Sequence, residues 1–322
     1  MPSVSIIIAT HSRPHLLPRA VESARRASED SEIIVVDDAS TDSTAEVCQA
    51  LQGIHYVRLD QNQGVAGARN VGILASTSDY ISFLDDDDIR LPGSLDLQLQ
   101  LFATNPDAGL AYGPVILGDQ DCKPTARTEP VQTPNGDLFW DLLSRTFIIC
   151  PSVVFRKACL FRVGLLNSEL PGLDDWDLWV RIAELYPLVA VEEPVAIWRM
   201  ATPSSLQGSS ASADHMLRIV RHQSELFSLP RVAAAPATMR EEARLRLLNF
   251  ASDWLIWEAA SWLAKGESRY ARKNILTALQ LNPARAVRPW TLKLFAQTFL
   301  TPQFVTPQRE DLEPGVAANE RA

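Results

Sequence analysis

The fold is decided by residues 4–51, which read VSIIIATHSRPHLLPRAVESARRASEDSEIIVVDDASTDSTAEVCQAL. Val4–Ala9 is a continuous apolar run, and a helical pattern follows it over residues 14–27. A second β-rich run, Glu32–Val36, ends in two aspartates, after which Ser40 or Asp42 can cap a helix that reaches Leu51. This order of elements is typical of an α/β fold with parallel strands.

The same alternation continues to residue 104. It predicts further strands at 54–59 and 80–84, and further helices at 67–75 and 92–104. These strands show no clean alternation of polar and apolar residues. We therefore expect a mainly parallel, Rossmann-like sheet whose two faces are both covered by helices.

The second half of the chain changes in character. Residues 115–200 predict shorter elements, namely strands at 115–117 and 152–155 and helices at 137–143 and 175–186. Residues 201–214 have few bulky apolar side chains, which is typical of a linker. From 215 to 299 the pattern is helical, and one broad apolar face is predicted from Leu247, Phe250, Trp254 and Trp257. We expect three regions: an α/β domain at 1–210, an all-α region at 211–300 and a disordered tail at 301–322.

Composition excludes several classes of protein. Of the 322 residues, 46% are hydrophobic and 21% are charged, which is a globular composition. No run of 18 apolar residues occurs, and the start MPSVSIIIAT lacks the basic region of a signal peptide, so we expect a cytoplasmic protein without a membrane-spanning helix. The four cysteines form no C-x-x-C pair, which favours reduced thiols over disulfides or a zinc site.

Charge is divided unevenly along the chain. Residues 1–214 hold 15 Lys and Arg against 29 Asp and Glu, which argues against nucleic acid as a partner. Residues 215–305 hold 13 against 6. Together with its tryptophans, this basic region predicts peripheral contact with the inner face of an anionic membrane. The alternative is a helical cap that packs these tryptophans against the α/β unit: Trp254, Trp257, Trp262 and Trp290.

Polar residues follow three of the predicted strands. They are Thr10-His11-Ser12-Arg13, Asp37-Asp38 and Asp85-Asp86-Asp87-Asp88. Because ligands of open α/β sheets bind outside the carboxyl ends of the strands, these residues predict one polar cleft. The alternative is that each of them only caps the helix that follows.

The run Asp85–Asp88 is the sharpest of these signals. Two carboxylates about 5 Å apart repel by ~3 kcal/mol at an effective dielectric constant near 20. The run therefore calls for a cation, and Arg90 is the only basic residue close to it in sequence. Oxygen ligands favour Mg²⁺ or Mn²⁺ held jointly with a phosphate. The alternative is a solvated acidic turn.

Two further segments carry polar groups. The stretch NQGVAGARNVG at 62–72 places Arg69 just inside a helix N-terminus that can face an anion, but it lacks the glycine spacing of dinucleotide and P-loop sites. The stretch LDDWDLW at 173–179 begins a helix, where carboxylates also complement the helix dipole. Its Trp176 and Trp179 either stack on sugar rings or belong to the core.

Taken in order, these motifs resemble those of the inverting glycosyltransferases of family 2, which have the GT-A fold. The matching segments span about residues 3–200 and are VSIIIATHSR, EIIVVDDASTDST, NQGVAGARNVG, DYISFLDDDD and LDDWDLWVRIAE. The resemblance implies a metal-dependent enzyme with Mn²⁺ or Mg²⁺ as cofactor. It would move a sugar from a nucleotide-sugar donor, UDP-linked, to a glycan or lipid-linked acceptor in the synthesis of a polysaccharide or glycoconjugate.

The resemblance also implies roles for individual residues. Asp175 matches the catalytic base, and Asp87 would hold the metal on the diphosphate. Asp174, Trp176 and Arg199 become candidates for contact with the acceptor or the donor sugar. The nucleotide sugar would be bound by Ala9, Thr10, His11, Arg13, Asp38, Arg69, Asp85 and Asp86.

The chain departs from the family pattern at two places. His11-Ser12 stands where Tyr-Asn or Phe-Asn is common, and Ala201 stands where many members have a histidine. Two other functions therefore stay open. One is a catalytically degenerate domain that binds a nucleotide sugar or scaffolds a complex. The other is a sugar nucleotidyltransferase, which would be expected to carry a basic pyrophosphate loop near the first strand.

Overall fold

The structure is a computed structural model and describes residues 3–200 and 213–299. The chain divides into two compact units, Met1–Leu142 with Thr146–Thr202 and Leu143–Arg145 with Pro203–Ala322. Ala201, the predicted tail at 301–322 and nearly all of the predicted linker at 201–214 lie outside the described residues.

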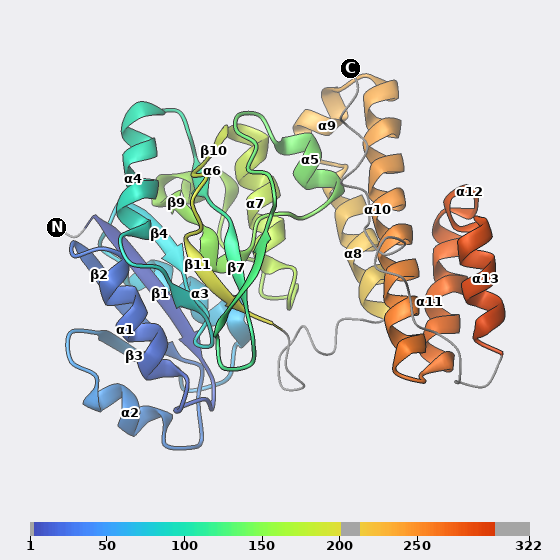
Figure 1. Cartoon of the computed structure of the whole chain (residues 1–322). Coiled ribbons are helices and arrows are strands. Elements are labelled where there is room, and N and C mark those ends of the chain that lie inside the picture. The colour runs from blue at the N-terminus through green and yellow to red at the C-terminus, as the bar shows by residue number, and fades with distance from the viewer. Residues whose placement is uncertain (1–2, 201–212, 300–322) are drawn as a thin grey trace. The chain divides into compact units, whose positions relative to one another are not determined.

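The first unit is built on a seven-stranded sheet (Figure 1) with the strand order β10-β6-β9-β4-β1-β2-β3. All neighbouring strands are parallel except β9, which is antiparallel to both β4 and β6. This confirms the mainly parallel α/β sheet predicted from the sequence. The strands are β1 (Val4–Thr10), β2 (Ser31–Asp37), β3 (His55–Arg58), β4 (Tyr80–Phe83), β6 (Leu110–Tyr112), β9 (Val154–Arg156) and β10 (Leu188–Ala190).

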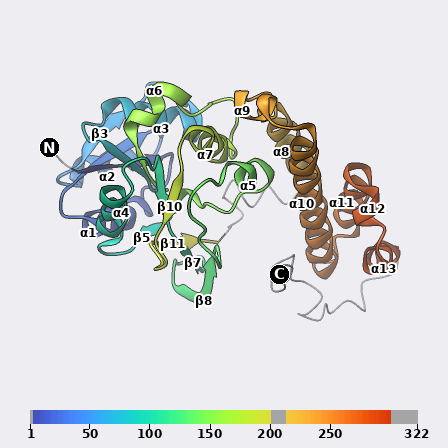
Figure 2. The ribbon, with the colours of Figure 1, turned by 90° about the horizontal axis from the view of Figure 1, so that it is seen from above.

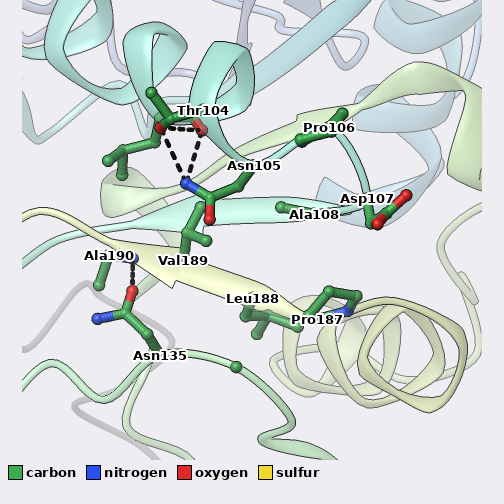
Figure 3. Close-up of a pocket in the computed structure, with 12 residues that line it drawn as sticks. Thr104, Asn105, Pro106, Asp107, Ala108, Asn135, Pro187, Leu188, Val189 and Ala190 are labelled. Carbon is green, nitrogen blue, oxygen red and sulfur yellow. Dashed lines mark hydrogen bonds between the residues drawn. The ribbon is translucent and has the colours of Figure 1, made fainter.

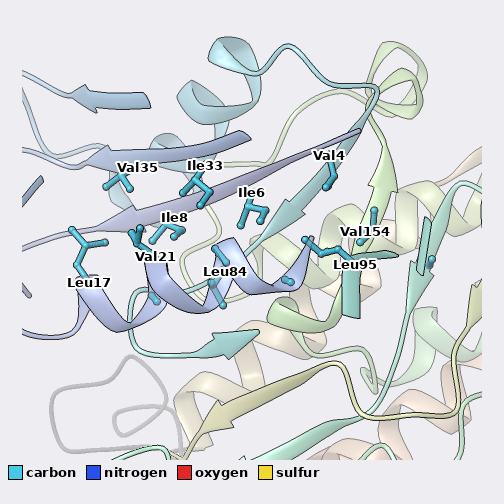
Figure 4. Packing of buried hydrophobic residues seen from close by; sticks show 14 of the residues in the cluster. Val4, Ile6, Ile8, Leu17, Val21, Ile33, Val35, Leu84, Leu95 and Val154 are labelled. Carbon is cyan, nitrogen blue, oxygen red and sulfur yellow. The ribbon is translucent and has the colours of Figure 1, made fainter. Parts of the chain in front are cut away.

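Helices cover both faces of this sheet. On one face, Val4, Ile6 and Ile8 of β1 pack in one buried cluster with Leu17 of α1 and Leu95 of α4 (Figure 4). The helices of the first unit are α1 (Leu17–Ala27), α2 (Thr44–Ala50), α3 (Gly64–Ala75), α4 (Ser94–Thr104), α6 (Leu160–Val163) and α7 (Asp174–Leu185), with short 3-10 turns η1 (Cys150–Ser152) and η2 (Lys157–Cys159). Helix α5 (Phe139–Ser144) contributes residues to both units.

The other face of the sheet is closed by α3 and α7. A Cβ atom at Gly72 of α3 would lie 2.4 Å from Cγ2 of Ile7, so α3 approaches β1 as closely as it does because residue 72 is glycine. Trp179 of α7 is fully buried, with ring centroids 6.2 Å from Phe83 and 5.7 Å from Phe155. This packing fixes the first turn of α7 next to β4.

A second, smaller sheet has the order β5-β11-β7-β8. Its strands are β5 (Ile89–Arg90), β11 (Ala196–Arg199), β7 (Val115–Gly118) and β8 (Pro124–Glu129). The sequence predicted β7 and missed the others. β5 pairs with β11 in antiparallel fashion directly after the four aspartates, so this sheet holds the end of the acidic run in place.

The second unit is helical, as predicted. Its helices are α8 (Ala213–Leu226), α9 (Pro230–Ala234), α10 (Ala237–Ala264), α11 (Ser268–Leu281), α12 (Pro283–Ala286) and α13 (Pro289–Gln297), and α10 and α11 lie side by side in both views (Figures 1 and 2). In the described part of the chain, no helix combines the length and the apolar character needed to cross a membrane.

The predicted apolar face of α10 is wrong beyond Leu247. Phe250 and Trp254 are only partly buried, and Trp257 is 39% exposed. The buried positions instead include Ala243, Ala251, Ala259 and Ala260. Small side chains at these positions let the backbone of a neighbouring helix approach closely, and the large aromatic side chains are left at the margins of the contact.

Candidate active site

The four aspartates that follow β4 form a tight turn at the carboxyl edge of the large sheet. The amide of Asp88 donates to the carbonyl of Asp85 at 3.0 Å. Carboxylate oxygens of Asp85, Asp87 and Asp88 all lie within 4.8 Å of one another, whereas Asp86 accepts from Oγ1 of Thr10 at 2.7 Å. The turn therefore gathers three carboxylates at one point, an arrangement that can hold a divalent cation.

Arginines from distant parts of the chain balance this negative charge. Arg13 and Arg199 both contact Oδ2 of Asp87, at 3.3 and 2.7 Å, and Arg13 also pairs with Asp86 at 3.0 Å. Arg90, the cation nearest in sequence, does not take part. It is buried, and its guanidinium donates to Gln98 of α4, to Ser82 of β4 and to the carbonyl of Val153.

Asp88 is the residue of this site that sequence reasoning did not single out. Its Oδ1 accepts from the amide of Arg199 at 2.8 Å, whereas its buried Oδ2 has no hydrogen-bond partner among the described residues. Burial, together with the charges of Asp85 and Asp87, raises the pKa of Asp88. A buried carboxylate oxygen without a partner is costly, and a bound cation would satisfy it. The donor set, which consists of oxygen atoms alone, fits Mg²⁺ or Mn²⁺. The only available signal in the sequence was that Asp88 is the fourth member of the run.

Residues after β1 and β2 form the neighbouring part of the same edge. Nδ1 of His11 lies 2.7 Å from the carbonyl of Asp38, and Oδ1 of Asp38 accepts from the amide of Gln63, just before α3, at 2.7 Å. Ala9 is half-buried at the end of β1, and the His11 ring is exposed. Asp37, by contrast, is fully buried and bound by Tyr56 and Arg58, so it serves the fold.

Arg69 connects the acidic turn with the start of α7. Its guanidinium donates to Oδ1 of Asp85 at 2.6 Å and to Oδ2 of Asp174 at 3.0 Å, and it lies over the ring of Phe83 at 5.1 Å. Arg69 and Asp174 are both buried. One buried cation thus holds together two acidic motifs that are far apart in the sequence.

Asp175 is half-buried in the first turn of α7, and its Oδ1 accepts from the amide of Trp176 at 2.7 Å. Burial and the adjacent charge of Asp174 raise the pKa of Asp175 to about 7. A carboxylate with a pKa near neutrality is suited to take a proton from a substrate at physiological pH.

The two tryptophans of this helix are core residues in the structure. Trp176 is 3% exposed, and its indole N–H donates to the carbonyl of Leu142 at 2.7 Å. Trp179 is buried against Phe83 and Phe155. Of the two interpretations of Trp176, the structure favours the core residue over a platform for a sugar ring.

Hydrogen bonds and ion pairs thus join most of the predicted site residues into one group. One network connects Thr10, Arg13, Asp86, Asp87 and Arg199, and another connects Arg69, Asp85 and Asp174. Asp88 joins the two, because its amide donates to the carbonyl of Asp85 and its carboxylate accepts from the amide of Arg199. His11 and Asp38 lie beside this group at the ends of β1 and β2.

A surface cavity of about 660 Å³ lies elsewhere, at the amino ends of β6 and β10 (Figure 3). It is lined by Asn105, Asp107, Asn135 and Pro187 among others. The cavity opens at the edge of the sheet opposite the acidic turn. Because the acidic turn and its arginines lie at the carboxyl edge of the sheet, we place the candidate active site there and not in this cavity.

The chain is similar to known glycosyltransferases. Residues 5–161 match the family described as glycosyl transferase family 2. An uncharacterized glycosyltransferase of Haemophilus influenzae is 28% identical over 182 residues, which is 56% of this chain and 62% of the relative, so the chain spans less than two thirds of that protein. The succinoglycan biosynthesis protein ExoU of Rhizobium meliloti is 28% identical over 76% of this chain and 75% of its own length.

A third relative matches more strongly over a shorter stretch. The GalNAc(5)-diNAcBac-PP-undecaprenol beta-1,3-glucosyltransferase of Campylobacter jejuni is 41% identical over 31% of this chain and 34% of its own length.

Solved structures share the fold at low sequence identity. S. aureus TarS 1–349 in complex with UDP-GlcNAc has a TM-score of 0.60 at 14% identity and covers 92% of this chain and 88% of its own. Mannosyltransferase PcManGT from Pyrobaculum calidifontis, in complex with GDP-Man and Mn²⁺, has a TM-score of 0.57 at 18% identity and covers 92% and 85%. These likenesses show the GT-A fold.

Proposed function

Because the chain belongs to glycosyl transferase family 2 through residues 5–161, we propose that it moves a sugar from a nucleotide-sugar donor, UDP-linked, to a hydroxyl group of a glycan or lipid-linked acceptor, with inversion at the anomeric carbon. We assign this activity to the α/β domain, residues 1–210. The observation that carries the proposal is the bridge from Asp85 through Arg69 to Asp174, which sets the acidic turn beside the carboxylates of α7.

The turn provides the diphosphate side of the proposed site. Asp87, together with Asp85 and Asp88, would hold Mg²⁺ or Mn²⁺, which would neutralise the charge of the departing diphosphate. Arg13 and Arg199 converge on Asp87 and can also donate to phosphate oxygens. His11 and Asp38 are assigned to the nucleoside, the first through its exposed ring and the second through its carboxylate.

Asp175 is assigned to the acceptor side as the general base. The acceptor oxygen forms its bond to the anomeric carbon from the face opposite the diphosphate, the bond to the diphosphate breaks, and the hydroxyl proton passes to Asp175. A base positioned in this way contributes about 10²–10⁴-fold to the rate. A single displacement needs no covalent intermediate with the protein.

The first test is thermal stability in the presence of UDP, dTDP, GDP, ADP and CMP, each with Mn²⁺ and with a chelator. A ligand at about 100 times its dissociation constant stabilises a protein by ~2.7 kcal/mol. We expect a shift with UDP that requires Mn²⁺ and is lost in Asp87→Asn. A shift with another nucleoside diphosphate would reassign the donor. No shift with any of them would refute the proposed activity in favour of a degenerate domain.

A further inference from the structure

The last helices of the second unit are strongly basic. Residues 268–299, which form α11, α12 and α13, contain six Lys and Arg and no Asp or Glu. We use the name basic surface for exposed side chains of α11 and α13 and of the residues next to α13: Arg269, Lys273, Leu276, Val287, Arg288, Leu292, Lys293 and Phe299. Like charges gathered in this way attract an anionic partner.

Large apolar side chains lie among these cations. Leu292 lies on α13, and Arg288 and Phe299 lie just outside the two ends of this helix. Leu292 is 51% exposed and Phe299 is 62% exposed. Thr291 and Leu294 of the same helix are buried, so α13 packs into its unit through these residues and leaves Leu292 exposed.

A cation of α11 contacts the apolar residues that follow α13. The guanidinium of Arg272 donates to the carbonyl of Thr298 at 3.1 Å and lies over the ring of Phe299 at 4.4 Å. Lys273 pairs with Asp214 of α8 at 2.5 Å, so part of its charge is balanced within the unit. Arg269, Arg288 and Lys293 remain as exposed cations beside exposed Leu292 and Phe299.

We propose that the basic surface docks on an anionic phospholipid bilayer. Exposed apolar side chains flanked by Lys and Arg are the pattern of helices that lie in the membrane interface, where the apolar groups enter the acyl boundary and the cations meet lipid phosphates. Each Lys or Arg near such a surface contributes about a factor of five to binding. This proposal goes beyond the transferase activity, and it would bring the protein to a surface on which lipid-linked acceptors reside.

The test is flotation of the full chain with vesicles of phosphatidylcholine alone or with 30% phosphatidylglycerol, at about 0.05 and 0.5 M salt. We expect binding to the anionic vesicles only, and release at high salt because the charges are screened. The double variant Arg288→Gln/Lys293→Gln should partition about thirty-fold more weakly. Arg240→Gln/Arg244→Gln is the matched control, because these exposed α10 cations lie next to Glu241 and Glu242.

The variant Leu292→Gln keeps every charge and should also weaken binding, since it removes an apolar group from the interface. Equal binding to neutral vesicles, no flotation at low salt, or an equal loss in the α10 control would each overturn the proposal. Concentration-dependent self-association that Leu292→Gln abolishes, without vesicle binding, would assign the face to a second copy of the chain instead. Nucleotide-induced thermal shifts on the same variants separate this outcome from failure of the proposed activity.

Discussion

Replacement of Arg69 by methionine tests the central bridge of the site. The guanidinium is buried and pairs with Asp85 and Asp174, and the Asp174 side chain is only 2% exposed. Arg69→Met keeps an unbranched apolar stem but leaves the Asp174 carboxylate buried without its cation. Loss of one partner of a buried ion pair costs about 3–5 kcal/mol. For a unit of this size, that loss lowers the melting temperature by ~6–20 °C.

The size of this effect also depends on pH in a defined direction. Burial raises the pKa of Asp174 and Arg69 opposes that rise, so the variant has a still higher pKa at Asp174. A carboxyl group with a raised pKa in the folded state destabilises the fold as pH rises through that pKa and ceases to do so when it is protonated. The difference in unfolding free energy between wild type and Arg69→Met should therefore shrink as the pH falls.

Urea denaturation at several pH values measures these changes. Arg26→Met is the matched control, because Arg26 also pairs with a carboxylate, Glu22 at 2.8 Å, but its side chain is 65% exposed; we expect at most ~1 kcal/mol there. Asp174→Asn added to Arg69→Met should recover much of the loss. The reasoning would be refuted if Arg69→Met cost no more than Arg26→Met, or if Asp174→Asn gave no recovery.

Three further changes test other parts of the structure. Asp175→Asn should lower kcat by about 10²–10⁴-fold and leave nucleotide affinity unchanged. In the wild type, kcat/KM should fall tenfold per pH unit below about pH 7, because protonated Asp175 cannot accept a proton. A pH–rate profile that is flat from 5 to 8 would contradict this assignment. Asp88→Asn should abolish the thermal stabilisation by Mn²⁺ with nucleoside diphosphate. It should keep or raise the melting temperature without metal, since it removes a buried charge. A variant that melts earlier without metal but keeps the Mn²⁺ effect would argue against Asp88 as a metal ligand. Gly72→Ala should lower the free energy of unfolding, measured by urea denaturation, by ~1–3 kcal/mol because its Cβ meets Ile7. The control Leu74→Ala lies on the same helix at a side chain that is 72% exposed, and it should change stability by less than ~0.5 kcal/mol. Equal effects would show that α3 can shift to make room.

The large sheet could be predicted from the sequence because its central strands are long apolar runs. Val4–Thr10 and Ser31–Asp37 need both faces covered whatever else the chain does. Strands such as Leu188–Ala190 and Ile89–Arg90 have three and two residues, and they exist because a partner strand lies beside them. Tertiary pairing of this kind leaves no periodic signal in the sequence.

The candidate site was predictable as a set of residues but not as a set of contacts. The strand-end rule placed Arg13, Asp38 and Asp85 on one edge. It did not reveal that Arg69 bridges two acidic motifs, because that depends on how α3 and α7 pack against the same face of the sheet. Arg90 is the basic residue nearest to the acidic run in sequence, yet its side chain lies in a buried network with Gln98 and takes no part in the site.

The burial of all four thiols makes this chain well suited to site-specific labelling. Cys48, Cys122, Cys150 and Cys159 are buried, and burial raises the pKa of Cys48 to about 12 and that of Cys122 and Cys159 to about 11. Since the thiolate is the reactive form, these groups react slowly with maleimides. A cysteine introduced at exposed Asp107 in the first unit and another at Arg240 in the second would take up fluorophores selectively. Energy transfer between the two dyes would then follow the two units through nucleotide and membrane binding in the otherwise native protein.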